Sequence, residues 1–183
     1  MASTPPLHHS AYGQGINRAH SPLLVRAVPW LSVMLATLLP LLLPIASAPL
    51  MPPVSFLMLV SWRQLRPGLL PIWAGLPLGL FDDLFSGQPF GSAILMWSVT
   101  MIAMEAIEAQ VPWRSVVVDW LAASVIIVLY LLATLGLANT GGGHVLAIMI
   151  VPQLLISVLV YPLTGRLVSW LDNFRLTRFR TLF

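Results

Sequence analysis

Apolar runs that are long enough to cross a lipid bilayer constrain this chain more than any other feature. The long runs cover residues 27–48, 69–85, 89–107, 115–139 and 144–165. Of the 183 residues, 58% are hydrophobic and only 8% are charged, whereas about 25% of the residues of a soluble domain carry a charge. In lipid, a helix satisfies its backbone hydrogen bonds internally. The sequence therefore predicts an all-α membrane protein built as one helical bundle.

The segment 49–62 is the hardest span to predict. Pro49, Pro52 and Pro53 interrupt its start. As a helix it would reach only about 21 Å, which is less than the hydrocarbon core of about 30 Å. A short or tilted helix would return the chain across the membrane, whereas a re-entrant segment would not. If the segment does span, the chain has about six transmembrane helices.

The distribution of arginine favours six spans. The nine basic residues are all arginine. With six spans and a cytoplasmic N-terminus, every one of them falls in a cytoplasmic segment: Arg18, Arg26, Arg63, Arg66, Arg114, Arg166, Arg175, Arg178 and Arg180. Cytoplasmic loops are the ones enriched in basic residues, and no orientation of a five-span chain achieves this separation. We therefore expect a disordered cytoplasmic tail over 1–26, a membrane domain over 27–171 and a basic amphipathic cytoplasmic tail over 172–183.

Composition also argues against several classes of function. The chain has no cysteine, so disulfides and thiolate metal sites are excluded. The arginines lie in loops rather than on a soluble basic face, which argues against nucleic-acid binding. The sequence contains no Ser-His-Asp set, no glycine-rich nucleotide loop and no His-Glu-x-x-His motif. We expect no enzyme activity, no cofactor and no metal, and the pair His8 and His9 is only a weak metal-ligand candidate.

Two adjacent carboxylates, Asp82 and Asp83, lie between two apolar runs. Neighbouring residues of a helix point about 100° apart, so these carboxylates do not face one substrate. A structural role fits better, because an aspartate at a helix end can cap backbone N–H groups of the following turn. Ser86 and Gly87 would then stop one helix, and Pro89 would begin the next. Contact with a partner protein is the second interpretation, and catalysis or transport is the third.

Small and amide residues within the runs predict contacts between helices. Gly75 and Gly79 have the small-xxx-small spacing that lets two membrane helices approach closely. Gln153 is the only amide in the interior of the runs. An amide in lipid needs a partner, so we expect Gln153 to hydrogen-bond to a neighbouring helix.

Two acidic residues, Glu105 and Glu108, share one helix face because they are three positions apart. They can pair with Arg114, or with Arg63 and Arg66. Exposed ion pairs contribute little to stability. The favoured interpretation is therefore that both acids are solvated at the membrane interface.

The stretch from Gly79 to Gly91 resembles a motif of the bacterial rod shape-determining protein MreD family. The pattern is Gly-apolar-apolar-apolar-Asp-apolar-apolar-Ser-Gly-x-Pro-apolar-Gly, carried here by Gly79, Asp83, Ser86, Gly87, Pro89 and Gly91. The resemblance covers about residues 25–172 and includes Pro152 and Gln153 in the last apolar run. Asp82 departs from the family pattern, which usually has an apolar residue at this position.

The resemblance implies a fold similar to the substrate-binding subunit of energy-coupling-factor transporters. It also implies a non-enzymatic scaffold of the cell-elongation complex, or elongasome. This scaffold would span the bacterial inner membrane, in contact with membrane lipid, and both of its termini would be cytoplasmic. Such a scaffold binds MreC and, through it, MreB, RodA and the penicillin-binding transpeptidase of RodA, and helps to control lateral peptidoglycan synthesis and cell shape. The alternative is a small-molecule-binding membrane subunit of a transporter, with Gln153 and tryptophans lining a pocket.

Overall fold

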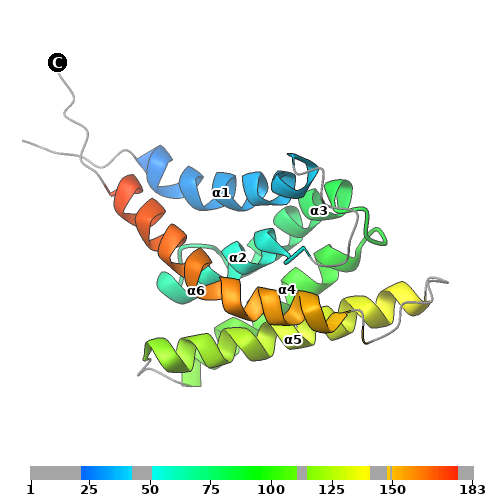
Figure 1. Cartoon of the computed structure of the whole chain (residues 1–183). Coiled ribbons are helices and arrows are strands. Elements are labelled where there is room, and N and C mark those ends of the chain that lie inside the picture. The colour runs from blue at the N-terminus through cyan, green and yellow to red at the C-terminus, as the bar shows by residue number, and fades with distance from the viewer. Residues whose placement is uncertain (1–21, 43–50, 111–114, 141–147, 149, 177–183) are drawn as a thin grey trace, which may run out of the picture.

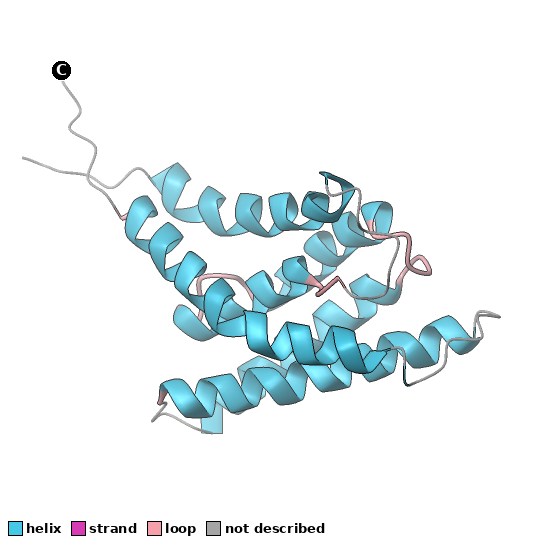
Figure 2. Cartoon of the chain, viewed as in Figure 1, coloured by secondary structure: helices cyan, strands magenta, loops and turns pink. Residues whose placement is uncertain are grey.

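The chain forms an all-helical bundle (Figure 1). The computed structural model describes residues 22–42, 51–110, 115–140, 148 and 150–176. The elements in chain order are α1 (Pro22–Leu42), α2 (Val54–Leu65), the short 3-10 helix η1 (Ile72–Ala74), α3 (Gly75–Phe85), α4 (Ser92–Gln110), α5 (Val116–Thr140) and α6 (Ile150–Arg175). Figure 2 shows helices and connecting loops, and no strand, in the described part of the chain. The predicted all-α class is confirmed.

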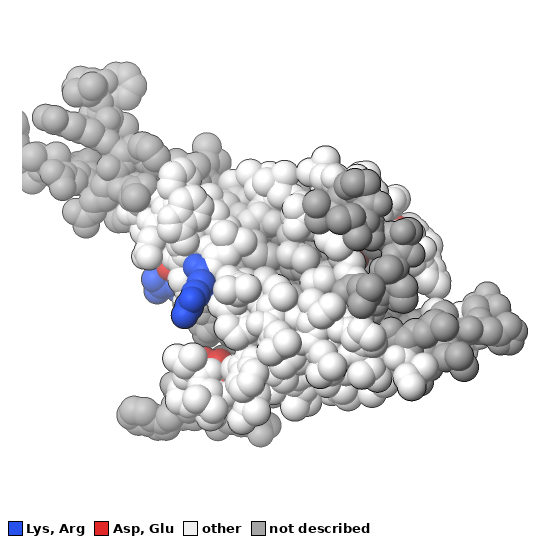
Figure 3. Space-filling model, in the orientation of Figure 1, with Lys and Arg blue, Asp and Glu red and all other residues white. Residues whose placement is uncertain are grey.

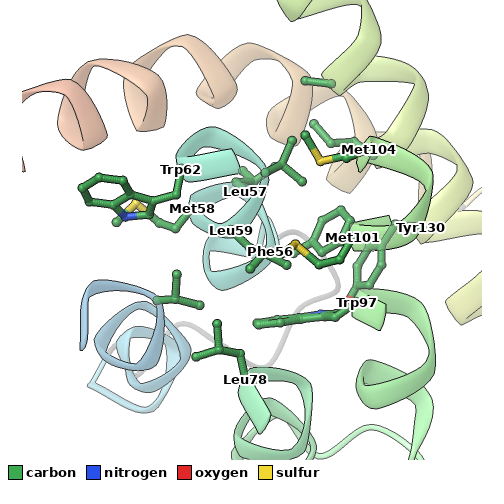
Figure 4. Packing of buried hydrophobic residues seen from close by; sticks show 14 of the residues in the cluster. Phe56, Leu57, Met58, Leu59, Trp62, Leu78, Trp97, Met101, Met104 and Tyr130 are labelled. Atoms are coloured by element: carbon green, nitrogen blue, oxygen red, sulfur yellow. The ribbon is translucent and has the colours of Figure 1, made fainter. Parts of the chain in front are cut away.

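Helix α2 lies at the centre of the bundle and is buried on every side. Residues 55–63 are all buried, and α1, α5 and α6 pack against this helix. A helix that is apolar around its whole circumference is expected to be enclosed in this way. Phe56 stacks on Tyr130 of α5, with 3.9 Å between ring centroids, and approaches Trp97 of α4 at 6.2 Å (Figure 4). Because protein encloses α2, its length need not match the thickness of the bilayer.

The helices alternate in direction, as the contacts between their ends show. At one end, Asp82 near the end of α3 meets Thr37 near the end of α1 and Ser55 at the start of α2. At the other end, Arg63 near the end of α2 meets Glu108 near the end of α4. Each helix from α1 to α6 runs opposite to the one before it (Figure 1). We call the two ends of the bundle the Asp82 end and the Arg63 end.

Three of the described helices are long and apolar enough to cross a membrane. They are Ser92–Ala109 in α4, Val116–Thr140 in α5 and Ile150–Arg175 in α6. The apolar part of α1, Arg26–Leu42, is shorter, and α2 and α3 have 12 and 11 residues. The chain therefore has the helices of a membrane protein, while six complete spans stay a prediction.

The predicted domain boundaries need correction at both ends of the bundle. Helix α1 begins at Pro22, so the tail predicted over 1–26 includes helical residues, and residues 1–21 lie outside the described part. Helix α6 continues to Arg175, because Asp172 and Arg175 are buried against the bundle. Helix α6 thus runs past the boundary predicted between 171 and 172. Most of the predicted C-terminal tail, residues 177–183, lies outside the described part.

The apolar run 69–85 forms a shorter helix than its composition suggests. Pro71 has an extended backbone, with φ −65° and ψ 156°, and η1 separates it from α3. In the described part of the segment 49–62, from Met51, the helix also begins only after Pro52 and Pro53, at Val54. Hydropathy does not show such late starts, because proline interrupts a helix without adding charge.

Candidate functional site

The α3–α4 hairpin holds Asp83 against the first turn of α4. The Asp83 carboxylate accepts hydrogen bonds from the backbone N–H groups of Gly91 (3.0 Å), Ala93 (2.9 Å) and Ile94 (3.1 Å). The Ser92 hydroxyl also donates to it, at 3.4 Å. The first N–H groups of a helix have no partner within the helix, and negative charge there also interacts favourably with the helix dipole. Asp83 therefore caps the helix that follows it.

Two glycines shape the turn between α3 and α4. Ser86 directly follows the last residue of α3. Gly87 and Gly91 have φ values of +68° and +93°, in the left-handed region that favours glycine. Pro89 lies within the turn, where its carbonyl accepts the Ser92 N–H at 3.0 Å. Because α4 begins at Ser92, the prediction that Pro89 begins this helix is wrong.

At Gly75 and Gly79, helices α3 and α4 approach each other closely. A Cβ atom at Gly75 would lie 2.8 Å from backbone atoms of Trp97 and Ser98. A Cβ atom at Gly79 would lie 2.7 Å from the carbonyl oxygen of Ala93. These neighbours are backbone atoms of a helix, which cannot move as a side chain can. The two glycines thus let the helices pack backbone against backbone.

Asp82 points away from Asp83 and into the bundle. Its Oδ1 atom accepts hydrogen bonds from the hydroxyls of Thr37 on α1 (3.0 Å) and Ser55 on α2 (2.8 Å). Only 4% of Asp82 is exposed. The two carboxylates thus act on different helices, Asp82 on α1 and α2 and Asp83 on α4. They do not form an acid–base pair directed at one target.

A polar cavity of about 310 Å³ lies beside Asp82. Its oxygen-bearing side chains are Thr37, Ser55, Asp82, Ser86, Gln88, Tyr130 and Gln153. The amide of Gln153 also donates to the backbone carbonyl of Met51 at 2.9 Å. The predicted partner of this amide is therefore found in the segment that precedes α2 rather than within a helix.

At the Arg63 end, a buried arginine joins α2 to α4. Arg63 is 1% exposed, and its guanidinium bonds to Glu108 at 3.1 and 2.8 Å and also to Glu105. A further N–H of the guanidinium donates to the carbonyl of Leu70 at 2.9 Å. Both glutamates thus pair with Arg63, and the favoured interpretation as solvated acids is wrong for Glu108, whereas the side chain of Glu105 is half exposed. The alternative partner Arg114 lies outside the described residues.

A second set of charges joins α2 to α6. Asp172 accepts from Arg66 at 3.0 and 2.9 Å and from Arg175 at 2.7 Å. Arg175 also lies over the ring of Trp62, 5.6 Å from its centroid. These contacts hold the last turns of α6 against the end of α2. They are the physical reason why the helical domain extends past residue 171.

A groove of about 860 Å³ lies between α2, α5 and α6 near the Arg63 end. Its lining is largely apolar, with a few polar groups: Ser61, Gln64, Asp119, Tyr161, Arg166, Ser169 and Asn173. Tyr161 donates to the side-chain oxygen of Gln64 across the groove. The groove has the size and character of many small-molecule sites.

The described residues contain no group of three or more His, Asp or Glu side chains that could hold a metal ion. His8 and His9 lie outside the described part of the chain. Within it, the polar groups at both ends of the bundle bond to one another and to backbone atoms. Their arrangement can hold helices together and can accept a positively charged or hydrogen-bonding group at the Asp82 cavity.

Asp82 was identified as a candidate from the sequence, whereas Thr37 and Ser55, whose hydroxyls donate to it, were not. Thr37 lies in the apolar run 27–48 and Ser55 in the apolar segment 49–62. A polar residue inside such a run is a signal in itself, since lipid offers it no partner. The sequence could not show that these two hydroxyls and Asp82 meet, because they come from three different helices.

Comparison with known proteins gives no assignment for this fold and site. No protein-family model matches the chain, and no match is found among curated proteins or solved structures. The resemblance to the MreD family therefore stays a prediction that depends on the motif residues.

Replacing Asp83 with alanine should destabilise the protein, because three backbone N–H groups at the start of α4, including that of Gly91 just before it, would lose their acceptor. Loss of a helix cap costs about 0.5–2 kcal/mol, and a change of this size lowers the Tm by a few degrees, about 2–4 °C per kcal/mol, for a chain of this length. Asp83→Asn keeps an acceptor oxygen and should fall between Asp83→Ala and the wild type. Thermal unfolding of the purified protein in detergent measures the effect.

Ser86→Ala in the same turn is the matched control for Asp83, since Ser86 is exposed. It should leave the Tm within about 1 °C, as surface substitutions usually do. Equal Tm values for Asp83→Ala and the wild type would contradict the capping role.

Gly79→Leu should disrupt the α3–α4 contact, because its side chain would overlap backbone atoms of α4. We expect a large loss of monodisperse protein in detergent, measured by size-exclusion chromatography. Leu84→Ile is the control, since Leu84 is 63% exposed on the same helix. A normal elution profile for Gly79→Leu would show that the two helices do not need this close approach.

Proposed function

We propose that the chain is a non-enzymatic membrane scaffold of the MreD type, which binds MreC in the cell-elongation complex and helps to control lateral peptidoglycan synthesis. The observation that carries the proposal is the stretch from Gly79 to Gly91. Asp83 caps α4, Gly79 allows the close helix contact, and Gly87 and Gly91 turn the chain. These residues of the pattern each have a structural role in the α3–α4 hairpin. That they act together in one hairpin supports the resemblance.

A six-span topology with both termini in the cytoplasm belongs to this proposal. Alternating helix directions support it, because α1 to α6 then cross in turn (Figure 1). The arginine distribution supports it too. Figure 3 shows the visible arginine side chains gathered at the end of the molecule where α6 finishes, the Arg63 end. This end would face the cytoplasm, as the positive-inside rule requires, and the Asp82 end would face outward.

The polar groups of the bundle support a scaffold rather than a catalyst. Asp83 is committed to the backbone of α4 and Arg63 to two glutamates, so each maintains helix positions. The outer faces are apolar, for example on α1, where Leu31, Leu35 and Leu42 are 54%, 66% and 76% exposed. Such faces meet lipid or a neighbouring transmembrane helix, which is the contact that a membrane-anchored partner would use.

Co-purification with full-length, membrane-anchored MreC tests the scaffold proposal. Tagged wild-type chain should retain MreC in mild detergent, and an unrelated single-span membrane protein should not be retained. A folded wild-type chain that captures no MreC, from either tagged partner, would contradict the proposal. Capture with unchanged cell shape on depletion of the chain would contradict the role in cell elongation.

Single cysteines test the proposed topology, because the chain has no native cysteine. Pro67 follows α2 and Ser86 follows α3, and both residues are exposed. In spheroplasts, a membrane-impermeant maleimide should label Ser86→Cys directly, and Pro67→Cys only after the membrane is permeabilised. Labelling in the reverse order would contradict the proposed topology, either because α2 does not cross the membrane or because the whole chain has the opposite orientation.

A small-molecule-binding subunit of a transporter is the second candidate function. The groove of about 860 Å³ between α2, α5 and α6 favours it, since ligand pockets commonly have volumes of about 300–1,000 Å³. Gln153, which the sequence placed in such a pocket, lies instead at the smaller cavity beside Asp82. Capture of a transporter ATPase module instead of MreC in the same experiment would favour this candidate.

A further inference from the structure

The cavity beside Asp82 is lined by several oxygen-bearing side chains, although most of the bundle interior is apolar. It lies at the Asp82 end, enclosed by α1, the start of α2, the end of α3 and parts of α5 and α6. The hydroxyls of Thr37, Ser55 and Tyr130 and the amides of Gln88 and Gln153 all border this space of about 310 Å³, together with the Asp82 carboxylate.

Asp82 brings a negative charge to this cavity without a positive partner among the described residues. None of the ion pairs between described residues includes it, since those pairs lie at the Arg63 end. Its neighbour Asp83 has the same sign of charge. The hydroxyls of Thr37 and Ser55 both donate to one carboxylate oxygen, Oδ1. A buried carboxylate is costly unless a positive charge or a proton compensates it.

We propose that this cavity binds a singly charged cation, an alkali metal ion or a small ammonium ion, against the Asp82 carboxylate. One carboxylate matches one positive charge. The two oxygens of Asp83 already serve the N–H groups of α4, and Asp83 does not line the cavity. A divalent ion such as Ca²⁺ usually takes 6–8 oxygen ligands including several carboxylates, which this site does not offer.

The neutral ligands of the cavity suit such an ion. A hydroxyl that donates to Asp82 keeps its lone pairs, so Thr37 and Ser55 can donate to the carboxylate and coordinate a cation at the same time. The oxygen atom of Gln153 can point to the ion, because its N–H₂ group already donates to the Met51 carbonyl, whereas the Oε1 atom of Gln88 already accepts from the Ser92 hydroxyl. The volume of about 310 Å³ exceeds that of a bare ion, so the ion would keep part of its water shell.

Cation binding at this cavity does not depend on whether the chain binds MreC. Purified wild-type protein in a neutral detergent is unfolded by heat at constant ionic strength, with sodium, potassium, methylammonium or the bulky cation N-methylglucamine as the only cation. We expect a higher Tm in at least one of the first three than in N-methylglucamine. A cation at ten times its Kd should raise the Tm by about 3–5 °C. An effect of methylammonium alone would identify an ammonium site, and an effect of sodium or potassium an alkali-ion site.

Two variants locate the effect. Asp82→Asn keeps an acceptor for Thr37 and Ser55 but removes the charge, and it should abolish the cation dependence of the Tm. Glu105→Gln removes a half-exposed carboxylate at the opposite end and should keep the dependence. If Asp82→Asn does not fold, Thr37→Val and Ser55→Ala serve instead, and each should weaken the apparent cation affinity several-fold.

Two outcomes would overturn the proposal. Equal Tm values of the wild type in all four cations would show that a proton, and not a bound cation, compensates Asp82. An equal cation effect in the wild type and in Asp82→Asn would show that the ion acts elsewhere on the molecule.

Discussion

Residues 55–63 of helix α2 are all buried, and the positions of the helices packed around it depend on this enclosure. Its polar groups must be satisfied by other parts of the protein, because an unpaired polar group in such a place is costly. The hydroxyl of Ser61 shares a hydrogen bond of 3.2 Å with that of Thr164 on α6. The indole N–H of Trp62 donates to Ser32 on α1 at 2.8 Å. Apolar packing and these few hydrogen bonds together fix α1 and α6 around α2.

At the two ends of α2, charged side chains satisfy the buried polar groups. At its start, Ser55 donates to Asp82 of α3; at its end, Arg63 bonds to two glutamates of α4. Three of the arginines that the sequence predicts on one side of a membrane, Arg63, Arg66 and Arg175, are also structural ion-pair partners. A buried ion pair gives little net stability, but removing one partner is costly. These contacts therefore define which helices meet at each end more than they add to the free energy of unfolding.

The paired aspartates show how adjacent residues of the same type acquire different roles. A helical step of about 100° turns Asp83 to the start of α4 and Asp82 to the centre of the bundle. Asp83 meets backbone N–H groups, which compensate its charge through the helix end. Asp82 meets hydroxyls, which satisfy one oxygen but carry no net charge. Asp82, which departs from the pattern of the family that the chain resembles, is thus also the carboxylate that lies beside the polar cavity.

Much of this organisation could be predicted from the sequence, because it depends on local properties. Hydropathy determines the class of protein, the glycine spacing predicts a close contact with another helix without saying which one, and the position of Asp83 predicts a cap. The late starts after Pro53 and Pro71 and the extension of α6 to Arg175 were not predictable from composition. The meeting of Thr37, Ser55 and Asp82, and the pairing of Arg63 with Glu105 and Glu108, were decided only by the tertiary structure. Each joins residues from different helices, and the rotation of one helix against another is set by the packing of the whole bundle.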